Sequence, residues 1–174
     1  ESFDPERQIA VGPVDRLAAL IQLVPAAGAD MDSVRRSRVG FETTRMRGTP
    51  YIMRRRILFV PPFVPCNPEP SGALVAIDLK TGTKAWETPI PPQLGGPIAT
   101  AGGLVFLAAT VDRQFRAFDI DTGRELWRAE LPAGGKATPM TYRGADGRQY
   151  VVIAAGGDGE TFGASDAIVA FALP

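Results

Sequence analysis

The chain has 174 residues, enough to bury a core of ordinary size, and its 19 basic and 19 acidic residues give a formal net charge of zero. That neutrality, with 45% hydrophobic content, excludes a disordered chain and a bulk electrostatic attraction to nucleic acid. There is no histidine and a single cysteine, so a Ser-His-Asp triad, imidazole metal sites and an internal disulfide are excluded as well.

Residues 2–14 read as two short strands around the turn Asp4-Pro5-Glu6-Arg7, because Ile9 and Val11 alternate with their neighbours. The chain starts without a signal peptide and as if in mid-fold, which predicts a piece of a longer polypeptide. No apolar run approaches the ~18 residues that a membrane span needs.

The strand pattern breaks in the segment at about 15–71, which we interpret as an insertion. Residues 17–24 fit a strand or a short helix, and both readings stay open. Two arginine clusters follow, at residues 35–38 and 54–56, and they fit either a solvated loop face or contact with an anionic partner such as a membrane surface. Cys66, set between prolines, is expected to be a packed loop thiol rather than a nucleophile.

The sequence pattern of residues 72–91 recurs at residues 113–132, which gives a repeat period of 41 residues. The period points to propeller blades, solenoids or arrays. Each copy reads as strand, tight turn and strand, with Asp-x-x-Thr-Gly supplying the turn and a Trp four residues after the Gly. We expect that Trp to be buried between neighbouring sheets. The recurring residues are Ala76, Asp78, Thr81, Gly82, Trp86 and Pro91, repeated as Ala117, Asp119, Thr122, Gly123, Trp127 and Pro132.

Residues 93–110 predict two strands joined by a Gly102-Gly103 turn, and they complete a four-stranded unit with the second hairpin. Residues 137–142, 149–155 and 167–173 repeat the first three strands of that unit. We therefore expect an all-β chain of about three four-stranded antiparallel blades of a β-propeller, the last lacking its outer strand. The expected divisions are residues 1–91, with the insertion, then 92–132 and 133–174.

A set of longer motifs resembles the C-terminal part of quinoprotein dehydrogenases that use pyrroloquinoline quinone (PQQ), in their membrane-bound glucose dehydrogenase-like branch. The likeness covers essentially the whole chain. The motifs are SFDPER, RGTPY, PCNPEP, AIDLKTGTKAW, LGGPIATAGGLVF, RAFDIDTGRELW, LPAGGKATPMTY, GRQYVVIAAGG and IVAFALP.

The resemblance implies an eight-bladed propeller with PQQ on its axis beside Ca²⁺, which oxidises a sugar or polyol and passes electrons to ubiquinone or a cytochrome. It also implies a periplasmic, membrane-associated parent protein. The metal ligands and the catalytic base are expected outside this chain. The rest of the propeller, or a second copy of the chain, would complete the ring, and the isolated chain is expected to be inactive.

The resemblance places candidate cofactor contacts in three glycine-rich turns. Leu94, Gly95 and Gly96 match one turn, Lys136 and Thr138 the next, and Gly157 the third. Small residues there would let the backbone approach a flat cofactor. Asp158 stands where the glucose-oxidising branch has histidine, and three readings stay open: a contact for substrate hydroxyls, a general base, or only the cap of a glycine-rich loop.

A non-catalytic propeller that serves as a binding or scaffold module is the alternative function, because the Thr-Gly-x-x-x-Trp repeat occurs in such proteins too. The glycine-rich turns and the Pro-Cys-Asn-Pro insertion favour the enzyme.

Overall fold

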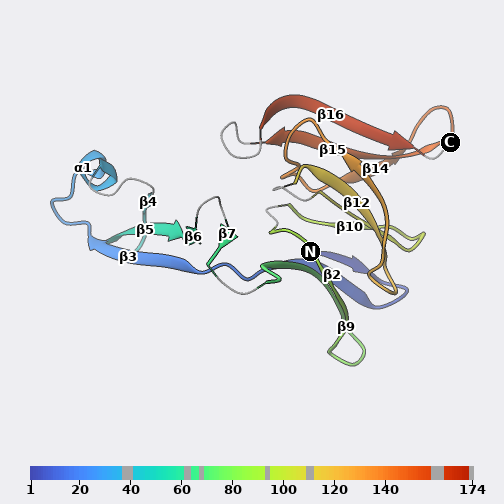
Figure 1. The fold of residues 1–174 in the computed structure, drawn as a ribbon, viewed down its shortest axis with the longest axis horizontal. Coiled ribbons are helices and arrows are strands. Elements are labelled where there is room, and N and C mark those ends of the chain that lie inside the picture. The colour runs from blue at the N-terminus through green and yellow to red at the C-terminus, as the bar shows by residue number, and fades with distance from the viewer. Residues whose placement is uncertain are drawn as a thin grey trace. The chain divides into compact units, whose positions relative to one another are not determined.

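The computed structural model describes residues 1–36, 41–60, 64–66, 69–92, 95–108, 112–157 and 163–172. It divides into two compact units, one made of residues 1–16 and 69–174 and the other of residues 17–68. Figure 1 shows that strands dominate both.

Three antiparallel sheets make up the first unit, in the orders β1-β2-β8-β9, β10-β11-β12-β13 and β14-β15-β16. The predicted all-β fold of antiparallel propeller blades is confirmed, and among the described residues the last sheet has three strands. The strands are β1 (Ser2–Asp4), β2 (Ile9–Asp15), β8 (Gly72–Asp78), β9 (Thr83–Pro89), β10 (Ile98–Ala99), β11 (Leu104–Ala108), β12 (Gln114–Asp119), β13 (Glu125–Glu130), β14 (Met140–Arg143), β15 (Gln149–Gly157) and β16 (Ala164–Ala172).

The β10–β13 sheet lies between the other two and has a hydrophobic core on each face (Figure 1). Successive side chains of a strand point to opposite faces, so β11 contributes Val105 and Leu107 to one core and Ala108 to the other. The first core also contains Leu74 of the preceding sheet, and the second core also contains Ile153 of the following sheet. Face-to-face stacking of small sheets is the blade packing that the repeat predicts.

The two repeated turns have the predicted chemistry. The Asp119 carboxylate accepts hydrogen bonds from the Thr122 hydroxyl and from the backbone N–H groups of Asp121 and Thr122. These bonds, the Thr122 hydroxyl first, hold the pKa of Asp119 below its usual value. Gly82 and Gly123 both adopt φ of +71°, a backbone conformation that glycine reaches without steric cost.

The two repeated tryptophans join adjacent sheets but are less buried than expected. Trp86 is half-buried, and its indole N–H donates to the Ile120 carbonyl of the next sheet at 2.8 Å. Trp127 packs edge-on against Phe171 of the third sheet and remains 37% exposed. By the repeat, Leu173 would stand where Ile120 stands for Trp86, and Leu173 lies outside the described residues.

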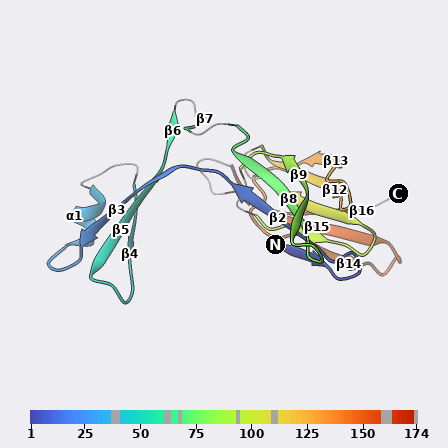
Figure 2. The ribbon, with the colours of Figure 1, turned by 90° about the horizontal axis from the view of Figure 1, so that it is seen from below.

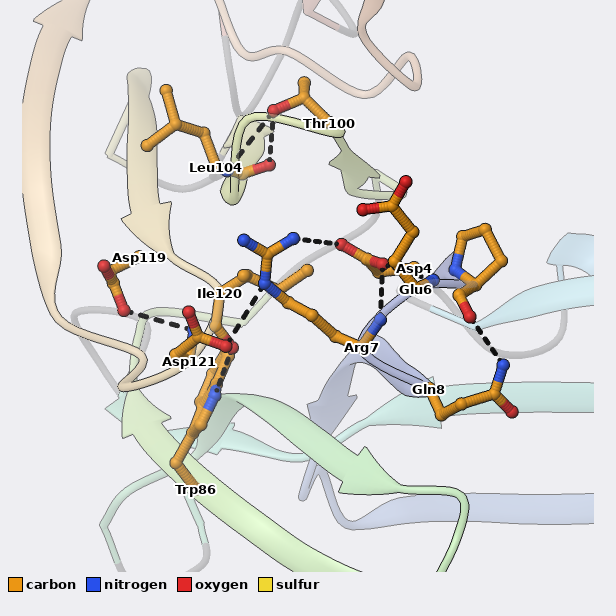
Figure 3. A network of polar contacts seen from close by, with 11 residues as sticks. Asp4, Glu6, Arg7, Gln8, Trp86, Thr100, Leu104, Asp119, Ile120 and Asp121 are labelled. Atoms are coloured by element: carbon orange, nitrogen blue, oxygen red, sulfur yellow. Dashed lines mark hydrogen bonds and ion pairs between the residues drawn. The ribbon is translucent and has the colours of Figure 1, made fainter.

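A polar network ties the first turn of the chain to the second repeated turn (Figure 3). Asp4 is almost fully buried and accepts bonds from the backbone N–H of Arg7 and from its guanidinium, and these, the backbone bond first, lower the pKa of Asp4. The Nε of Arg7 lies 3.3 Å from a carboxylate oxygen of Asp121 in the neighbouring sheet. Arg7 therefore links the first two sheets beside the Trp86 contact.

Glu87 is expected to make the stability of the first unit depend on acid pH. Lys84 and Arg16 both donate to its carboxylate, at 2.6 and 2.5 Å, and they lower the pKa of Glu87 from 4.5 to about 2. A carboxylate whose pKa is depressed on folding adds stability above pH 4.5, and this contribution is lost as pH falls towards 2.

Urea midpoints recorded between pH 6 and pH 2, roughly the range over which such a group titrates, would measure this loss. Glu87→Gln should reduce the fall of the urea midpoint at acid pH, which we call the acid limb of the stability profile. Lys84→Gln should move the acid limb to higher pH, because one of the two cations that lower the pKa of Glu87 is gone. An unchanged acid limb in Glu87→Gln would show that other carboxylates control it.

The second unit contains a three-stranded sheet in the order β3-β5-β4, a short helix beside it and a two-stranded ribbon (Figure 2). Residues 17–24, open between strand and helix, contribute most of β3. The elements are β3 (Ala19–Pro25), α1 (Met31–Arg36), β4 (Glu42–Arg45), β5 (Tyr51–Ile57), β6 (Phe59–Val60) and β7 (Val64–Pro65). In the described part of the chain, no helix is long and apolar enough to cross a membrane.

Two expectations about this second unit need correction. Cys66 is exposed rather than packed, although its backbone N–H donates to the Leu58 carbonyl. The arginines at 54–56 are not one solvated cluster, since alternation along β5 sends them to opposite faces. Arg54 is buried and donates to the Val34 carbonyl of α1, whereas Arg55 is exposed and pairs with Glu42.

Candidate functional site: three glycine-rich turns

Three glycine-rich turns lie at one end of the sheets of the first unit, and we call them the glycine end: Gly95–Gly96, Gly134–Thr138 and Gly156–Gly157. Strand direction places them there. The first turn enters β10, the second joins β13 to β14, and the third closes β15. The repeated Asp-Thr-Gly turns and the Arg7 network lie at the other ends of these strands.

The first two turns touch directly. A methyl group added at Gly95 would lie 3.1 Å from the Gly135 carbonyl oxygen and 3.4 Å from that of Ala137. A methyl group added at Gly96 would lie 2.8 Å from the Thr138 hydroxyl. Glycine at these two positions therefore lets one turn approach the next across the gap between sheets.

The second turn is also hydrogen-bonded to the third. The Gly157 N–H donates to the Gly134 carbonyl at 2.9 Å, with Gly157 at φ of +63°. Gly135 is wedged against the sheets, since an added methyl group would lie 2.5 Å from Ala108 Cβ and 3.4 Å from Ile153 Cγ1. The turns predicted as cofactor contacts are thus held together by backbone packing.

The candidate residues differ in how far their side chains reach solvent. Thr138 is exposed, Lys136 is half-buried, and Gly157 is half-buried at the end of β15. Gly134 and Gly135, which precede Lys136 and Thr138 in the second turn, are buried. The polar side chains of this turn therefore follow directly after its packed backbone. Leu94 and Asp158, also predicted as site residues, lie outside the described residues.

A charge cluster around a buried arginine in a middle strand of the β10–β13 sheet escaped the sequence analysis. Arg116 of β12 is 6% exposed, donates to both carboxylate oxygens of Asp112, and lies 3.2 Å from a carboxylate oxygen of Glu125. The first repeat has Val75 at the equivalent position, so the repeat gave no signal. Only a charged residue inside an otherwise apolar strand pattern pointed to it.

The chemistry of the described residues can be compared with what a cofactor and a metal ion would each require. A hydroxyl at Thr138, an ammonium at Lys136 and backbone kept close by glycines suit one edge of a planar, polycarboxylated molecule such as PQQ. Within the described ranges, no three Cys, Asp or Glu side chains gather closely enough to hold a metal ion, so these residues do not fit a Ca²⁺ site. A small pocket lined by Phe3, Asp4, Glu6 and residues 99–101 opens at the opposite end of β10.

Comparisons with known proteins agree with this architecture. Residues 1–151 match the family model described as "PQQ: Glucose/ethanol/alcohol dehydrogenase, beta-propeller domain". Over 99% of its length the chain is 38% identical to the quinoprotein glucose dehydrogenase of Escherichia coli and 35% identical to the quinate/shikimate dehydrogenase (quinone) of Acinetobacter baylyi. It spans about a quarter of either relative: 25% and 24%.

Among solved structures, a europium-containing methanol dehydrogenase superposes with a TM-score of 0.63 at 29% identity, over 89% of this chain and 24% of that one. The stacked antiparallel sheets, the repeated hairpins and the sequence matches therefore lead to one conclusion. The chain belongs to the β-propeller domain family of PQQ-dependent glucose, ethanol and alcohol dehydrogenases.

Proposed function

We propose that the polypeptide carrying this chain is a quinoprotein dehydrogenase that oxidises a sugar or polyol and passes the electrons to a quinone. The observation that carries the proposal is the glycine end, where the three glycine-rich turns pack together. The polar side chains of Lys136 and Thr138 lie on the solvent-accessible side of this packed backbone. Family membership and the names of two relatives, a glucose dehydrogenase and a quinone-linked quinate dehydrogenase, support it.

In this proposal PQQ, when bound, would supply the redox chemistry as the two-electron acceptor for oxidation of the substrate's alcohol group. The residues of this chain would position and shield the cofactor. The Thr138 hydroxyl would donate a hydrogen bond to the edge of the cofactor, and the Lys136 ammonium would balance the negative charge of the cofactor. Gly95, Gly96 and Gly157 would keep the surrounding backbone close. Asp158 is proposed as a contact for substrate hydroxyls.

The proposal leaves other parts of the reaction to residues outside the described ranges. The Ca²⁺ ligands and the catalytic base belong there, in a periplasmic, membrane-associated protein with ubiquinone or a cytochrome as acceptor. The isolated chain should give no turnover, because three sheets would leave the cofactor open to water and lose the preorganised electrostatics of a closed ring.

The test uses the complete polypeptide carrying this chain, loaded with PQQ and Ca²⁺. We expect dye reduction with at least one aldose or polyol, with quinate tested alongside. Failure to bind PQQ would overturn the proposal, and turnover of quinate alone would overturn the substrate class.

Thr138 gives the sharpest test of the site residues. Thr138→Val should weaken PQQ binding roughly tenfold, as expected for one lost hydrogen bond to a charged group. Thr141→Val, three residues along on β14, is the matched control and should bind PQQ as the unaltered protein does. Equal affinity in both variants would remove Thr138 from the site.

A further inference from the structure

One face of the sheet in the second unit has no covering element among the described residues of that unit. Alternation along β3 and β5 puts Ile21, Leu23, Tyr51 and Met53 on this face, which we call the open face. Ile21, Leu23 and Tyr51 are exposed, the first two at 57% and 52%. Neighbouring apolar side chains exposed together mark an interaction surface rather than ordinary surface.

The helix that could have covered this face is bound to the other one. Arg54 points away from the open face, and its guanidinium donates to the Val34 carbonyl of α1 at 3.0 Å. Val34 and Ile52, on that same side, are buried. The short helix therefore packs on the opposite face, and it leaves the open face uncovered within the described part of the unit.

Charge indicates what kind of partner fits. Residues 17–68 contain eight arginines against three acidic residues, a formal net charge of +5, and the rest of the chain carries −5. Arg47 lies exposed in the turn that leads into Tyr51, and Arg55 lies on the open face beside Glu42. Two such units meeting face to face would repel each other, which disfavours a symmetric pairing of two copies.

We propose that the open face binds an anionic lipid surface, independently of the activity proposed above. Aliphatic side chains and a tyrosine would enter the boundary between headgroups and acyl chains, and the arginines at the rim would pair with lipid phosphates. Arginine suits the rim because its aliphatic stem lies along apolar surface while its charged head reaches outward.

Flotation of the full chain with lipid vesicles tests this proposal. The chain should float with phosphatidylcholine vesicles that contain phosphatidylglycerol, less with phosphatidylcholine alone, and less as salt is raised. Leu23→Ser should weaken binding about tenfold through lost apolar burial. Leu20→Ser is the matched control, since Leu20 is 46% exposed on the opposite face of the same strand, and its binding should not change.

Arg47→Gln should weaken binding to the anionic vesicles roughly fivefold, the effect of one basic residue near such a surface. Arg148→Gln, an exposed arginine of the first unit, should have no effect. Unchanged circular dichroism and urea midpoints would show that all variants fold. The proposal is overturned if the chain does not float, if Leu20→Ser and Leu23→Ser lose binding equally, or if light scattering finds a dimer that Leu23→Ser abolishes.

Discussion

Replacing Trp86 by alanine should cost about 3–5 kcal/mol in the free energy of unfolding, because the change leaves a cavity between two sheets. The indole packs against the core that the first two sheets share and covers Gly123 of the second repeated turn. It also donates to the Ile120 carbonyl. Urea unfolding of the full chain, followed by far-ultraviolet circular dichroism, measures the loss.

Trp127 provides the matched control, since it holds the same place in the second repeat. Because it is 37% exposed, Trp127→Ala should cost less, about 2 kcal/mol. Trp86→Phe keeps most of the ring and loses the N–H donor, which is expected to cost about 1 kcal/mol. Equal losses at Trp86 and Trp127 would contradict the idea that Trp86 is the stronger of the two inter-sheet contacts.

Gly123→Ala should destabilise the chain by about 3 kcal/mol through two separate effects. The left-handed backbone at φ of +71° costs roughly 1 kcal/mol for any residue with a Cβ. The new methyl group would also lie 2.4 Å from Trp86 Cε3 and 2.7 Å from the Thr88 hydroxyl, an overlap that forces the indole off its neighbour. The urea midpoint gives the size of the effect, and the emission maximum of Trp86, recorded in a Trp127→Phe background so that it is the single tryptophan, reports the displaced ring.

Gly82 separates the two effects, because it has the same φ with no atom within 4 Å of an added methyl group. Gly82→Ala should cost only the backbone share, about 1 kcal/mol. In a Trp86→Ala background Gly123→Ala should cost less than in the unaltered chain, because the overlapping ring is gone and only the Thr88 contact and the backbone cost remain. A Gly123→Ala penalty that is unchanged without Trp86 would show that overlap with the ring is not its cause.

The hairpins, their turns and the blade-like sheets were predictable because their signals are local. Asp119 and its turn partners lie within four residues of one another, and the repeat of 41 residues shows the same pattern twice. The tryptophans were expected between sheets, and their contacts bear this out. Their degree of burial was not predictable, since it depends on how much of the next sheet each ring meets.

The glycine end was predictable as a set of turns but not as a packed unit. Small residues at Gly95 and Gly96 suggested approach to a cofactor, and the structure adds that they also admit the neighbouring turn. The contact role of these residues towards PQQ stays a prediction. Arg116 carried no repeated signal, since Val75 holds the equivalent position in the first repeat. The tight packing of Gly135 was not predictable because its neighbours, Ala108 and Ile153, come from other strands.

The sequence by itself determined the fold class, the hairpins and the family likeness, since strand alternation, turn residues and repeat spacing are properties of neighbouring positions. Tertiary structure alone decided which glycines face another backbone. It also decided that Arg54 binds a helix while Arg55 faces outward, and that an apolar sheet face is left open. Each of these depends on which distant segment packs against a residue, and spacing along the chain does not encode that.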